Sequence, residues 1–244
     1  MDEKKKIVKE KYAEALTKAE KEKNTVRTEG SVIHSSRPEQ GLFSQEIMAP
    51  SFGCIYNLPA QANITKGMTV IDFGSGTGYD LIKAVRLTGP TGKVIGVDMT
   101  KEMVEKAKKN MEKMGYENVE IIYAEIEDIP LPEKIADVII SNCVINLAPD
   151  KLAVFKEVFR LLKSGGRLVD GDKIAKEPLP KSLQENTDAW CGCVSGALTE
   201  EGYKKTLQKA GFTDIQISLD KEDSFQWEGE EIMIYSGILR ATKP

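Results

Sequence analysis

The chain has 244 residues, of which 41% are hydrophobic and 30% are charged, and its formal net charge is −4. This composition is typical of a globular protein with a hydrophobic core, and the small negative charge argues against broad binding to nucleic acid or to an anionic membrane surface. No stretch approaches the roughly 20 apolar residues of a transmembrane helix, and no signal peptide is visible. We therefore expect a cytoplasmic protein whose four cysteines are reduced thiols.

The first fifty residues differ in pattern from the rest of the chain. Residues 4–23 are rich in Lys and Glu and carry apolar side chains at near-helical spacing, which predicts an amphipathic helix. Residues 24–50 lack periodicity and contain two glycines and two prolines, which predicts a long loop. We expect residues 1–50 to form an N-terminal helix with a lid loop, and residues 51–244 to form the main domain.

From Met68 onward, predicted strands alternate with predicted helices. Runs of β-branched residues indicate the strands, and apolar residues at helical spacing indicate the helices between them. This alternation predicts an α/β fold with a doubly wound, mostly parallel sheet. The predicted strands cover 70–73, 94–97, 119–123 and 136–140, a fifth begins at 167–170, and Gly165 and Gly166 are expected to end the helix before it.

The last third of the chain departs from this alternation. Residues 176–198 are irregular, with two prolines and a Trp-Cys-Gly-Cys segment. Thr199 is expected to cap a helix that stops at Gly211. Two further strands are expected at 215–219 and 232–240.

The most informative stretch is residues 70–80, where the first strand ends. Asp72 is followed by glycines at alternate positions, Gly74, Gly76 and Gly78. Glycine is needed where the backbone takes a positive φ or comes close to a ligand, and the carboxyl end of a strand is the usual ligand crevice of an open α/β sheet. The alternative is a tight strand–helix turn that binds nothing.

An acidic residue, Asp98, ends the second strand about 20 residues further on, where it suits the two hydroxyls of a ribose. The glycine pattern is GxGxG with Asp72 just upstream, and it resembles the loop of class I S-adenosylmethionine (SAM) methyltransferases. SAM has no pyrophosphate and carries a positive sulfonium and amino group, so an acidic residue is tolerable there. The resemblance implies that SAM is the methyl donor.

On the other side of the predicted crevice, the sequence offers cysteine side chains rather than a general base. The one histidine, His34, lies in the N-terminal loop, so no Cys/His or Ser/His/Asp arrangement can be assembled. Cys143 directly follows the fourth strand, at the ligand edge of the fold, and polar Asn142 precedes it. A free cysteine is usually a small buried hydrophobe, and for Cys54 or Cys191 alone we favour that interpretation.

Residues 141–147, Ser-Asn-Cys-Val-Ile-Asn-Leu, are similar to the hallmark segment of arsenite methyltransferases. The resemblance covers most of residues 8–240. It implies a seven-stranded sheet that ends in an antiparallel hairpin, a methyltransferase domain at 51–244, and a substrate-site insertion at 176–198. The other similar segments are 8–16, 51–54, 96–100, 160–166 and 193–198.

The resemblance also implies roles for the matching residues. Cys143 and Cys193, joined by Cys54, would be the catalytic thiolates that hold trivalent arsenic, a soft centre that prefers sulfur. Thiolate-bound arsenic keeps a lone pair and has no proton to lose, so catalysis would rest on proximity and orientation. Asp98 would bind the ribose of SAM. The rest of the SAM pocket would comprise Asp72, Gly74, Gly76, Gly78, Met99, Ile126, Glu127 and Asn142.

The sequence departs from the family at two places. Both concern the reduction of arsenic that has to follow a methyl transfer. The family commonly has a further cysteine upstream of the Cys54 position, where this chain has Ser35 and Ser36, and Cys191 is an extra cysteine close to Cys193. Returning arsenic from the pentavalent to the trivalent state requires two electrons, which two thiols can supply by forming a disulfide. Either Cys191 pairs with Cys54, or Cys191 is inert and a thiol reductant such as glutathione or thioredoxin acts instead.

Two other functions stay open at this point. One is a SAM-dependent methyltransferase of a small organic metabolite (C-, O- or N-methylation), in which the cysteines are structural. The other is a SAM- or metalloid-binding sensor on the same scaffold. The set of cysteines favours arsenic over an organic metabolite, and the intact glycine loop with Asp98 argues against a sensor. The expected partners are a small molecule or metalloid and a thiol reductant, with no nucleic acid and no membrane, and the oligomeric state is left open.

Overall fold

The computed structural model describes residues 3–21 and 53–244. The lid loop expected at 24–50 and the residues named within it (His34, Ser35 and Ser36) lie outside the described residues. The strands are β1 (Thr69–Phe73), β2 (Lys93–Asp98), β3 (Val119–Tyr123), β4 (Ala136–Asn142), β5 (Leu162–Ala175), β6 (Thr213–Trp227) and β7 (Glu230–Thr242). The helices are α1 (Glu3–Lys21), α2 (Leu58–Gln61), α3 (Tyr79–Thr88), α4 (Lys101–Lys113), α5 (Lys151–Leu161), α6 (Lys181–Glu185), α7 (Thr187–Cys191) and α8 (Glu200–Ala210), with a 3-10 turn, η1, at Ile145–Leu147.

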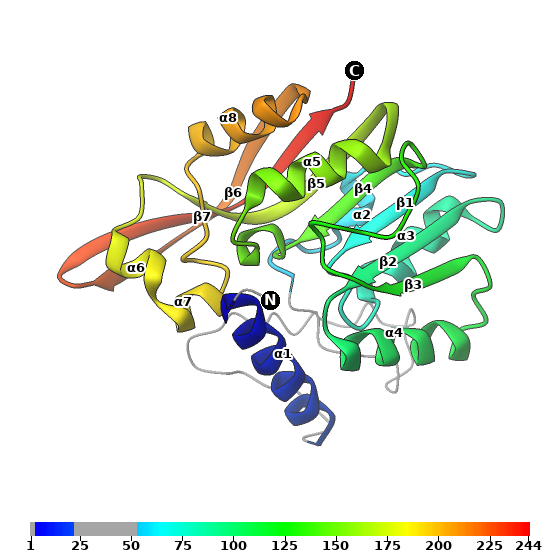
Figure 1. Cartoon of the computed structure of the whole chain (residues 1–244), viewed down its shortest axis with the longest axis horizontal. Helices are drawn as coiled ribbons and strands as arrows, with labels where there is room; N and C mark the ends of the chain where they lie inside the picture. Colours follow the sequence, from blue (N-terminus) through cyan, green and yellow to red (C-terminus); the bar gives the residue numbers. More distant parts are fainter. Residues whose placement is uncertain (1–2, 22–52) are drawn as a thin grey trace.

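The strands form one seven-stranded sheet in the order β3-β2-β1-β4-β5-β7-β6, covered by helices on both faces (Figure 1). Strands β1 to β5 run parallel to their neighbours, whereas β7 runs antiparallel to both β5 and β6. This confirms the doubly wound, mostly parallel sheet with a final antiparallel hairpin. The order reverses between β1 and β4, so their carboxyl ends form the crevice in which such sheets bind ligands.

Each face of the sheet has its own hydrophobic core. On one face α5 and α8 pack through side chains such as Phe155 and Tyr203, both fully buried. On the other face α2, α3 and α4 pack through side chains such as Leu58, Leu81 and Met111. No helix among the described residues is long and apolar enough to span a membrane.

The predicted helix after Thr199 begins and ends as expected. The Thr199 hydroxyl accepts a hydrogen bond from the backbone N–H of Gly202 at 3.1 Å. Gly211, just past the helix, has the left-handed φ of 104° that favours glycine.

The prediction that Gly165 and Gly166 end the preceding helix is wrong. That helix, α5, already ends at Leu161, and β5 begins at Leu162, so both glycines lie inside the strand. Leu161 and Leu162 are fully buried in the core. Leu162 is already extended, with φ −70° and ψ 141°, and pairs with Ala136 of β4, so strand pairing sets the boundary before the glycines are reached.

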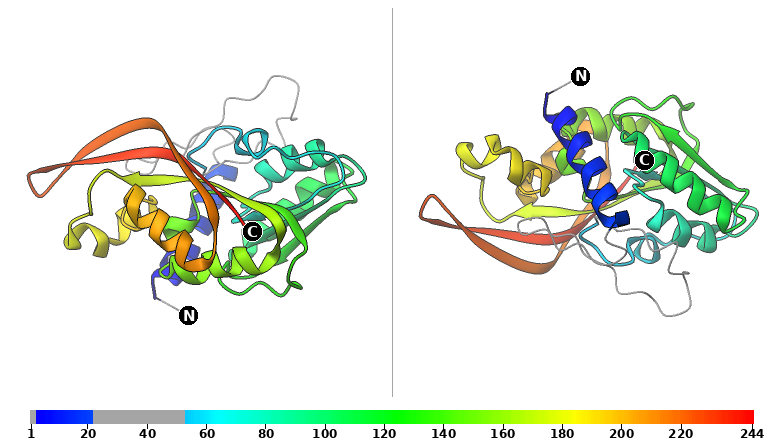
Figure 2. Two further views of the ribbon diagram at one scale, coloured as in Figure 1. Left: turned by 90° about the horizontal axis from the view of Figure 1, so that it is seen from above. Right: turned by 90° about the horizontal axis from the view of Figure 1, so that it is seen from below.

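The C-terminal strands are longer than the sequence pattern indicated. Figure 2 shows β6 and β7 extending past the rest of the sheet as a two-stranded arm. The short helix α6 packs beside this arm, where the Trp227 indole N–H donates to the Ser182 hydroxyl at 3.1 Å. The segment 176–198, which we expected to be irregular, thus contains two short helices, α6 and α7.

A buried polar network fixes the chain that follows β4. The fully buried Asp172 carboxylate accepts hydrogen bonds from the backbone N–H groups of Asn146 (3.0 Å) and Lys173 (2.8 Å). The Asn146 side-chain amide donates to the carbonyl oxygens of Lys173 (2.8 Å) and Cys193 (3.1 Å). The Tyr203 hydroxyl donates to the Asn146 side-chain oxygen. The network therefore ties β5, η1, α8 and the turn after α7 together.

Lys151 lies at the edge of this network. Its side chain is only 8% exposed, and its Nζ is 3.3 Å from the carbonyl oxygen of Ala148. Burial lowers the Lys151 pKa to about 8, although the nearby charge of Asp172 opposes that shift.

We expect Lys151→Met to raise the free energy of unfolding at pH 7, and this gain to shrink as the pH rises to 10. The Lys151 pKa of about 8 in the folded protein lies below its ordinary 10.5, so the unfolded chain binds more protons between these values. Wild-type stability therefore increases with pH across that window, whereas methionine contributes no such term. Urea unfolding at pH 7, 8.5 and 10 measures the difference. Lys156→Met, at an exposed position of the same helix, is the control, and a pH-independent difference for Lys151→Met would contradict the expectation.

Candidate active site

A cavity that opens to solvent lies at the carboxyl ends of β1, β2 and β4. Helix α1 closes one side of it through Lys5, Val8 and Tyr12. Gly78, one of the predicted cofactor residues, is not in its wall but caps α3. The other predicted cofactor residues all line the cavity: Asp72, Gly74, Gly76, Asp98, Met99, Ile126, Glu127 and Asn142.

The glycine loop is shaped by two close contacts. Gly74 has a φ of 73°, and a Cβ there would lie 2.2 Å from a methyl carbon of Val144. Gly76 has a φ of 51°, and its N–H donates to the Asp98 carboxylate at 2.9 Å. The other oxygen of that carboxylate accepts from the backbone N–H of Thr100 at 2.8 Å. Asp98 therefore holds the loop against the end of β2 while its side chain also lines the cavity.

Two buried carboxyl groups, Asp72 and Asp80, form the acidic part of the wall. Burial raises the pKa of both, and repulsion from Asp80 raises that of Asp72 further. One Asp80 oxygen accepts from the Asn142 side-chain amide at 3.0 Å, and the other has no hydrogen-bond partner in the described structure. An unpartnered buried carboxylate oxygen beside a second carboxyl group suits a positively charged ligand.

These wall groups fit S-adenosylmethionine. The buried hydroxyls of Ser75 and Thr77 line the same cavity and have no hydrogen-bond partner among the described residues. SAM carries two positive centres, a ribose with two hydroxyls and an adenine, so it could partner both the acidic pair and the hydroxyl groups. The donor and acceptor set is therefore that of a cationic nucleoside ligand.

The structure gathers all four cysteines at one end of the cavity. Cys143 lines the cavity and forms a disulfide with Cys54, and their Cα atoms are 5.8 Å apart. The buried Cys193 donates from its Sγ to the carbonyl oxygen of Cys143 at 2.9 Å. Cys191 is half-buried and packs against the same cluster, together with Trp190. Segments far apart in the sequence therefore meet here.

The expectation that all four cysteines are reduced is wrong for this structure, and the disulfide expected as one alternative, Cys54–Cys191, is not the one that it contains. We expected reduced thiols throughout and, for the reduction step, either a disulfide between Cys54 and Cys191 or an inert Cys191. Cys54 is instead paired with Cys143, and Cys191 is free. The cause is local: the Asn142 amide accepts from the Ile55 N–H (3.1 Å) and donates to the Ile55 carbonyl (2.9 Å). These two bonds hold the residue before Ile55 beside the residue after Asn142.

The predicted arsenic ligands have unusual surroundings. Cys143 and Cys193 both have left-handed backbones, with φ of 59° and 61°, which are uncommon outside glycine and concentrate at functional sites. A carboxylate oxygen of Asp172 and the Sγ atoms of Cys54 and Cys143 all lie within 4.8 Å of one another. Burial raises the pKa of the Cys193 thiol well above its usual range, and the charge of Asp172 adds to this.

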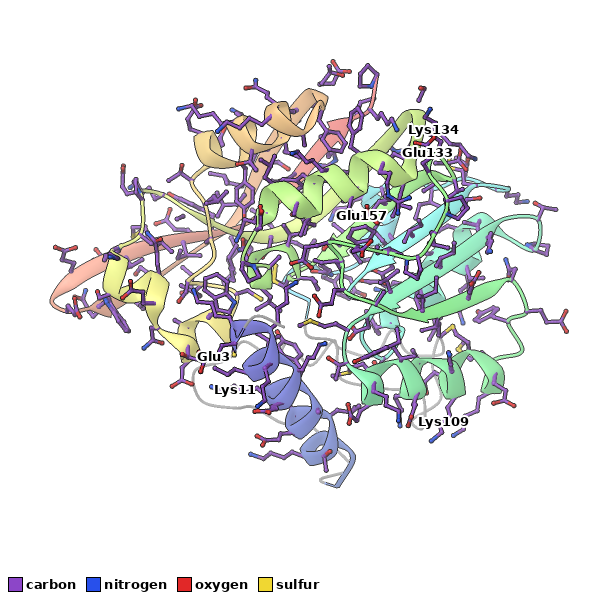
Figure 3. The ribbon with its side chains drawn as sticks, in the orientation of Figure 1. Glu3, Lys11, Lys109, Glu133, Lys134 and Glu157 are labelled. Carbon is purple, nitrogen blue, oxygen red and sulfur yellow. A yellow bond between two sulfur atoms is a disulfide. The ribbon has the colours of Figure 1, made fainter. Side chains whose placement is uncertain are left out.

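Helix α1 joins the two ends of the site. At the glycine-loop end, the Lys5 ammonium lies 2.8 Å from the Glu127 carboxylate. At the cysteine end, the Tyr12 hydroxyl donates to the carbonyl oxygen of Cys191 at 3.3 Å. Lys11, labelled in Figure 3, forms an ion pair with the aspartate of α7. The N-terminal helix is therefore part of the site wall.

Sequence analysis missed several residues of this wall. Asp80 could have been found, because the first turn of a helix after a glycine loop faces the same crevice as the loop. Asp172 stands two positions after Asp170 in a predicted strand, so the alternation of strand faces could have drawn attention to it. Lys5 gave no such signal, since helical periodicity does not say against which surface a helix packs, and Tyr12 was marked only by the resemblance of segment 8–16.

Comparison with known proteins gives relatives over most of the chain. A family model described as a methyltransferase domain matches residues 64–211. The arsenite methyltransferase of Halobacterium salinarum is 40% identical over 195 residues, which are 77% of this chain and 50% of that protein. The arsenite methyltransferase of Aquipseudomonas alcaligenes is 37% identical over 183 residues, 72% of this chain and 52% of that protein. The chain thus spans about half the length of these curated relatives.

A solved structure extends the similarity further. The crystal structure of an arsenic(III) S-adenosylmethionine methyltransferase from Chlamydomonas reinhardtii matches with a TM-score of 0.69 and 30% sequence identity. The match covers 90% of this chain and 75% of that chain. With identity at this level over most of both chains, the chain belongs to the family of arsenic(III) S-adenosylmethionine methyltransferases.

Proposed function

We propose that this chain transfers a methyl group from SAM to trivalent arsenic that is bound by the thiolates of Cys54, Cys143 and Cys193. The observation that carries the proposal is the meeting of these three sulfurs at the end of the ligand cavity. Cys143 lines that cavity, Cys54 is bonded to Cys143, and the Cys193 thiol donates to the Cys143 carbonyl. Arsenic(III) is a soft centre, and soft centres select cysteine sulfur.

We propose the following roles for the wall of the cavity. Asp98, at the end of β2, accepts hydrogen bonds from the ribose hydroxyls. The buried pair of Asp72 and Asp80 receives the amino group, because its unpartnered oxygen and its negative charge suit a cation. Met99 and Ile126 are apolar parts of the wall that suit the adenine ring. Four other predicted cofactor residues of the wall shape the pocket: Gly74, Gly76, Glu127 and Asn142. Gly78 caps helix α3 beside the glycine loop.

The reaction needs positioning rather than proton transfer. Bound SAM supplies an electrophilic methyl group on its sulfonium. Three thiolate bonds leave the arsenic lone pair free, and no proton has to be removed, so the side chains have to align arsenic with the methyl carbon. Leu147 and Val8 line the cavity near Cys143 and help to keep water away from the arsenic.

The proposed reaction requires a thiol reductant. The disulfide between Cys54 and Cys143 occupies two of the three sulfurs, so it has to be reduced before both can bind arsenic. Reduction takes two electrons, which a thiol partner such as glutathione or thioredoxin supplies by disulfide exchange.

The same proposal divides the chain into functional parts. Residues 51–244 are the methyltransferase domain, and residues 176–198 are an insertion that brings Cys193 to the substrate end. Within the N-terminal part, residues 1–50, helix α1 covers one side of the site. Contacts of α1 with both ends of the cavity support this division, since Lys5 and Tyr12 lie in the wall.

Cys143→Ser and Cys193→Ser should each abolish arsenite methylation and leave SAM binding within about twofold. Serine is nearly the size of cysteine but is a poor ligand for soft arsenic. Methylated arsenic formed from SAM, arsenite and excess thiol is measured, and calorimetry with SAM on the same samples is the control for folding. Methylation of arsenite at the wild-type rate by either variant would reject the proposed ligands and favour an organic substrate.

Asp98→Ala should weaken SAM binding tenfold or more. Loss of a hydrogen bond to a charged acceptor costs about 1.5–3 kcal/mol, and the variant also loses the bonds that Gly76 and Thr100 donate to this carboxylate. Calorimetric titration with SAM gives the affinity, and Glu105→Ala, at an exposed position of α4, is the matched control. Unchanged affinity in a folded Asp98→Ala protein would refute the assignment to the ribose.

A further inference from the structure

Two cysteines stay free when Cys54 and Cys143 are joined, and they are only two residues apart. Cys191 is half-buried and Cys193 is buried, and both pack in one cluster with Trp190. We infer that Cys191 and Cys193 form a second, two-thiol arsenic(III) site that is available in the disulfide form of the protein. This inference rests on the proposed function, because it concerns the same substrate at a different stage of the cycle.

The turn that carries the two thiols is held in place. Cys191 is the last residue of α7, and Gly192 follows with φ −85° and ψ 11°. The backbone N–H of Cys193 then donates to the carbonyl of Trp190 at 3.0 Å. Consecutive Cα atoms are 3.8 Å apart, so the Cα atoms of Cys191 and Cys193 are no more than about 7 Å apart. That separation allows both sulfurs to reach one arsenic atom after rotation about χ1 of the half-exposed Cys191.

The same spacing is poor for a direct disulfide. A bond between sulfurs at positions i and i+2 closes a small ring, and disulfide geometry tolerates little distortion. An arsenic atom between the two sulfurs widens the ring. The pair of Cys191 and Cys193 therefore suits a soft trivalent centre better than it suits oxidation to a disulfide.

One thiol of this site is partly exposed to solvent, and the other is buried. The Tyr12 hydroxyl donates a hydrogen bond to the Cys191 carbonyl (3.3 Å). The buried Asn146 side-chain amide donates one to the Cys193 carbonyl (3.1 Å). Cys191 is partly open to solvent, whereas the Cys193 thiol points inward to the carbonyl of Cys143. Arsenic can therefore be taken up or passed on at Cys191 while Cys193 keeps it beside the main site.

In the proposed cycle, the second site keeps methylated arsenic on the protein after the arsenic has lost two of its sulfur ligands. When the Cys54 and Cys143 thiolates give two electrons to pentavalent methylarsenic, they become a disulfide and the arsenic becomes trivalent. The product then loses both of these ligands. Binding to Cys191 and Cys193 needs no redox change: methylarsonous acid, CH3As(OH)2, and two thiols give a dithiolate and two waters.

The test uses the protein with the Cys54–Cys143 disulfide intact and without added thiol. Phenylarsine oxide is the probe, because it condenses with two thiols to give a dithiolate and one water. Native mass spectrometry after gel filtration should show one phenylarsenic per wild-type chain. Cys191→Ser should bind the probe at least tenfold more weakly, since one sulfur bond is lost, and Cys191→Ala is a second variant in case the serine perturbs folding.

The matched control is the double variant Cys54→Ser/Cys143→Ser, which has only the proposed pair and should retain the adduct as well as the oxidised wild type. Equal retention by the Cys191 variants and the wild type, or no adduct on both the oxidised wild type and the double variant, would overturn the inference. The proposed function is tested separately, by arsenite methylation with the reduced wild type. An intact adduct without methylation would refute that function and leave the two-thiol site standing.

Discussion

The side-chain amide of Asn142 is the interaction on which the site depends. It bonds both backbone groups of Ile55 and also donates to the Asp80 carboxylate. One side chain thus joins the end of β4, the cysteine loop and the first turn of α3. The contact is so close that only glycine fits at position 53, because a Cβ on Gly53 would lie 2.4 Å from the Asn142 amide nitrogen. Without this junction the sulfurs of the loop and of β4 would not share one cavity with the glycine loop.

Most of the fold and the cofactor side of the site could be predicted, because local signals determine them. Alternating β-branched runs and helical stripes predicted the parallel strands, and the GxGxG loop with Asp98 predicted where a ligand cavity lies. The substrate side was predicted only in part. Resemblance selected Cys143 and Cys193, but the sulfur that pairs with Cys143 depends on the amide bonds of Asn142, which span 87 residues. Likewise, no local signal says that Tyr12 of α1 packs against Cys191.

The two disulfide-bonded cysteines and the two free cysteines lie in different parts of the fold. Cys54 and Cys143 belong to the rigid sheet edge, where a parallel strand and an amide junction fix both ends. Cys191 and Cys193 belong to an insertion held by α1 and by the Asn146 side chain. The proposed cycle therefore uses a redox-active pair on the scaffold and a ligand pair on an attached segment, and helix α1 contacts both regions.

If, as proposed, the buried acid pair receives the amino group of SAM, cofactor binding is a proton-linked event. Burial raises the pKa values of Asp72 and Asp80, and repulsion from Asp80 raises that of Asp72 further, so without a cationic ligand the pair retains a proton to higher pH than free carboxyl groups would. A cation bound beside them stabilises the ionised form and releases that proton to the solvent. Affinity for the methyl donor then rises with pH over the range in which the pair titrates, and the heat of binding depends on the ionisation enthalpy of the buffer.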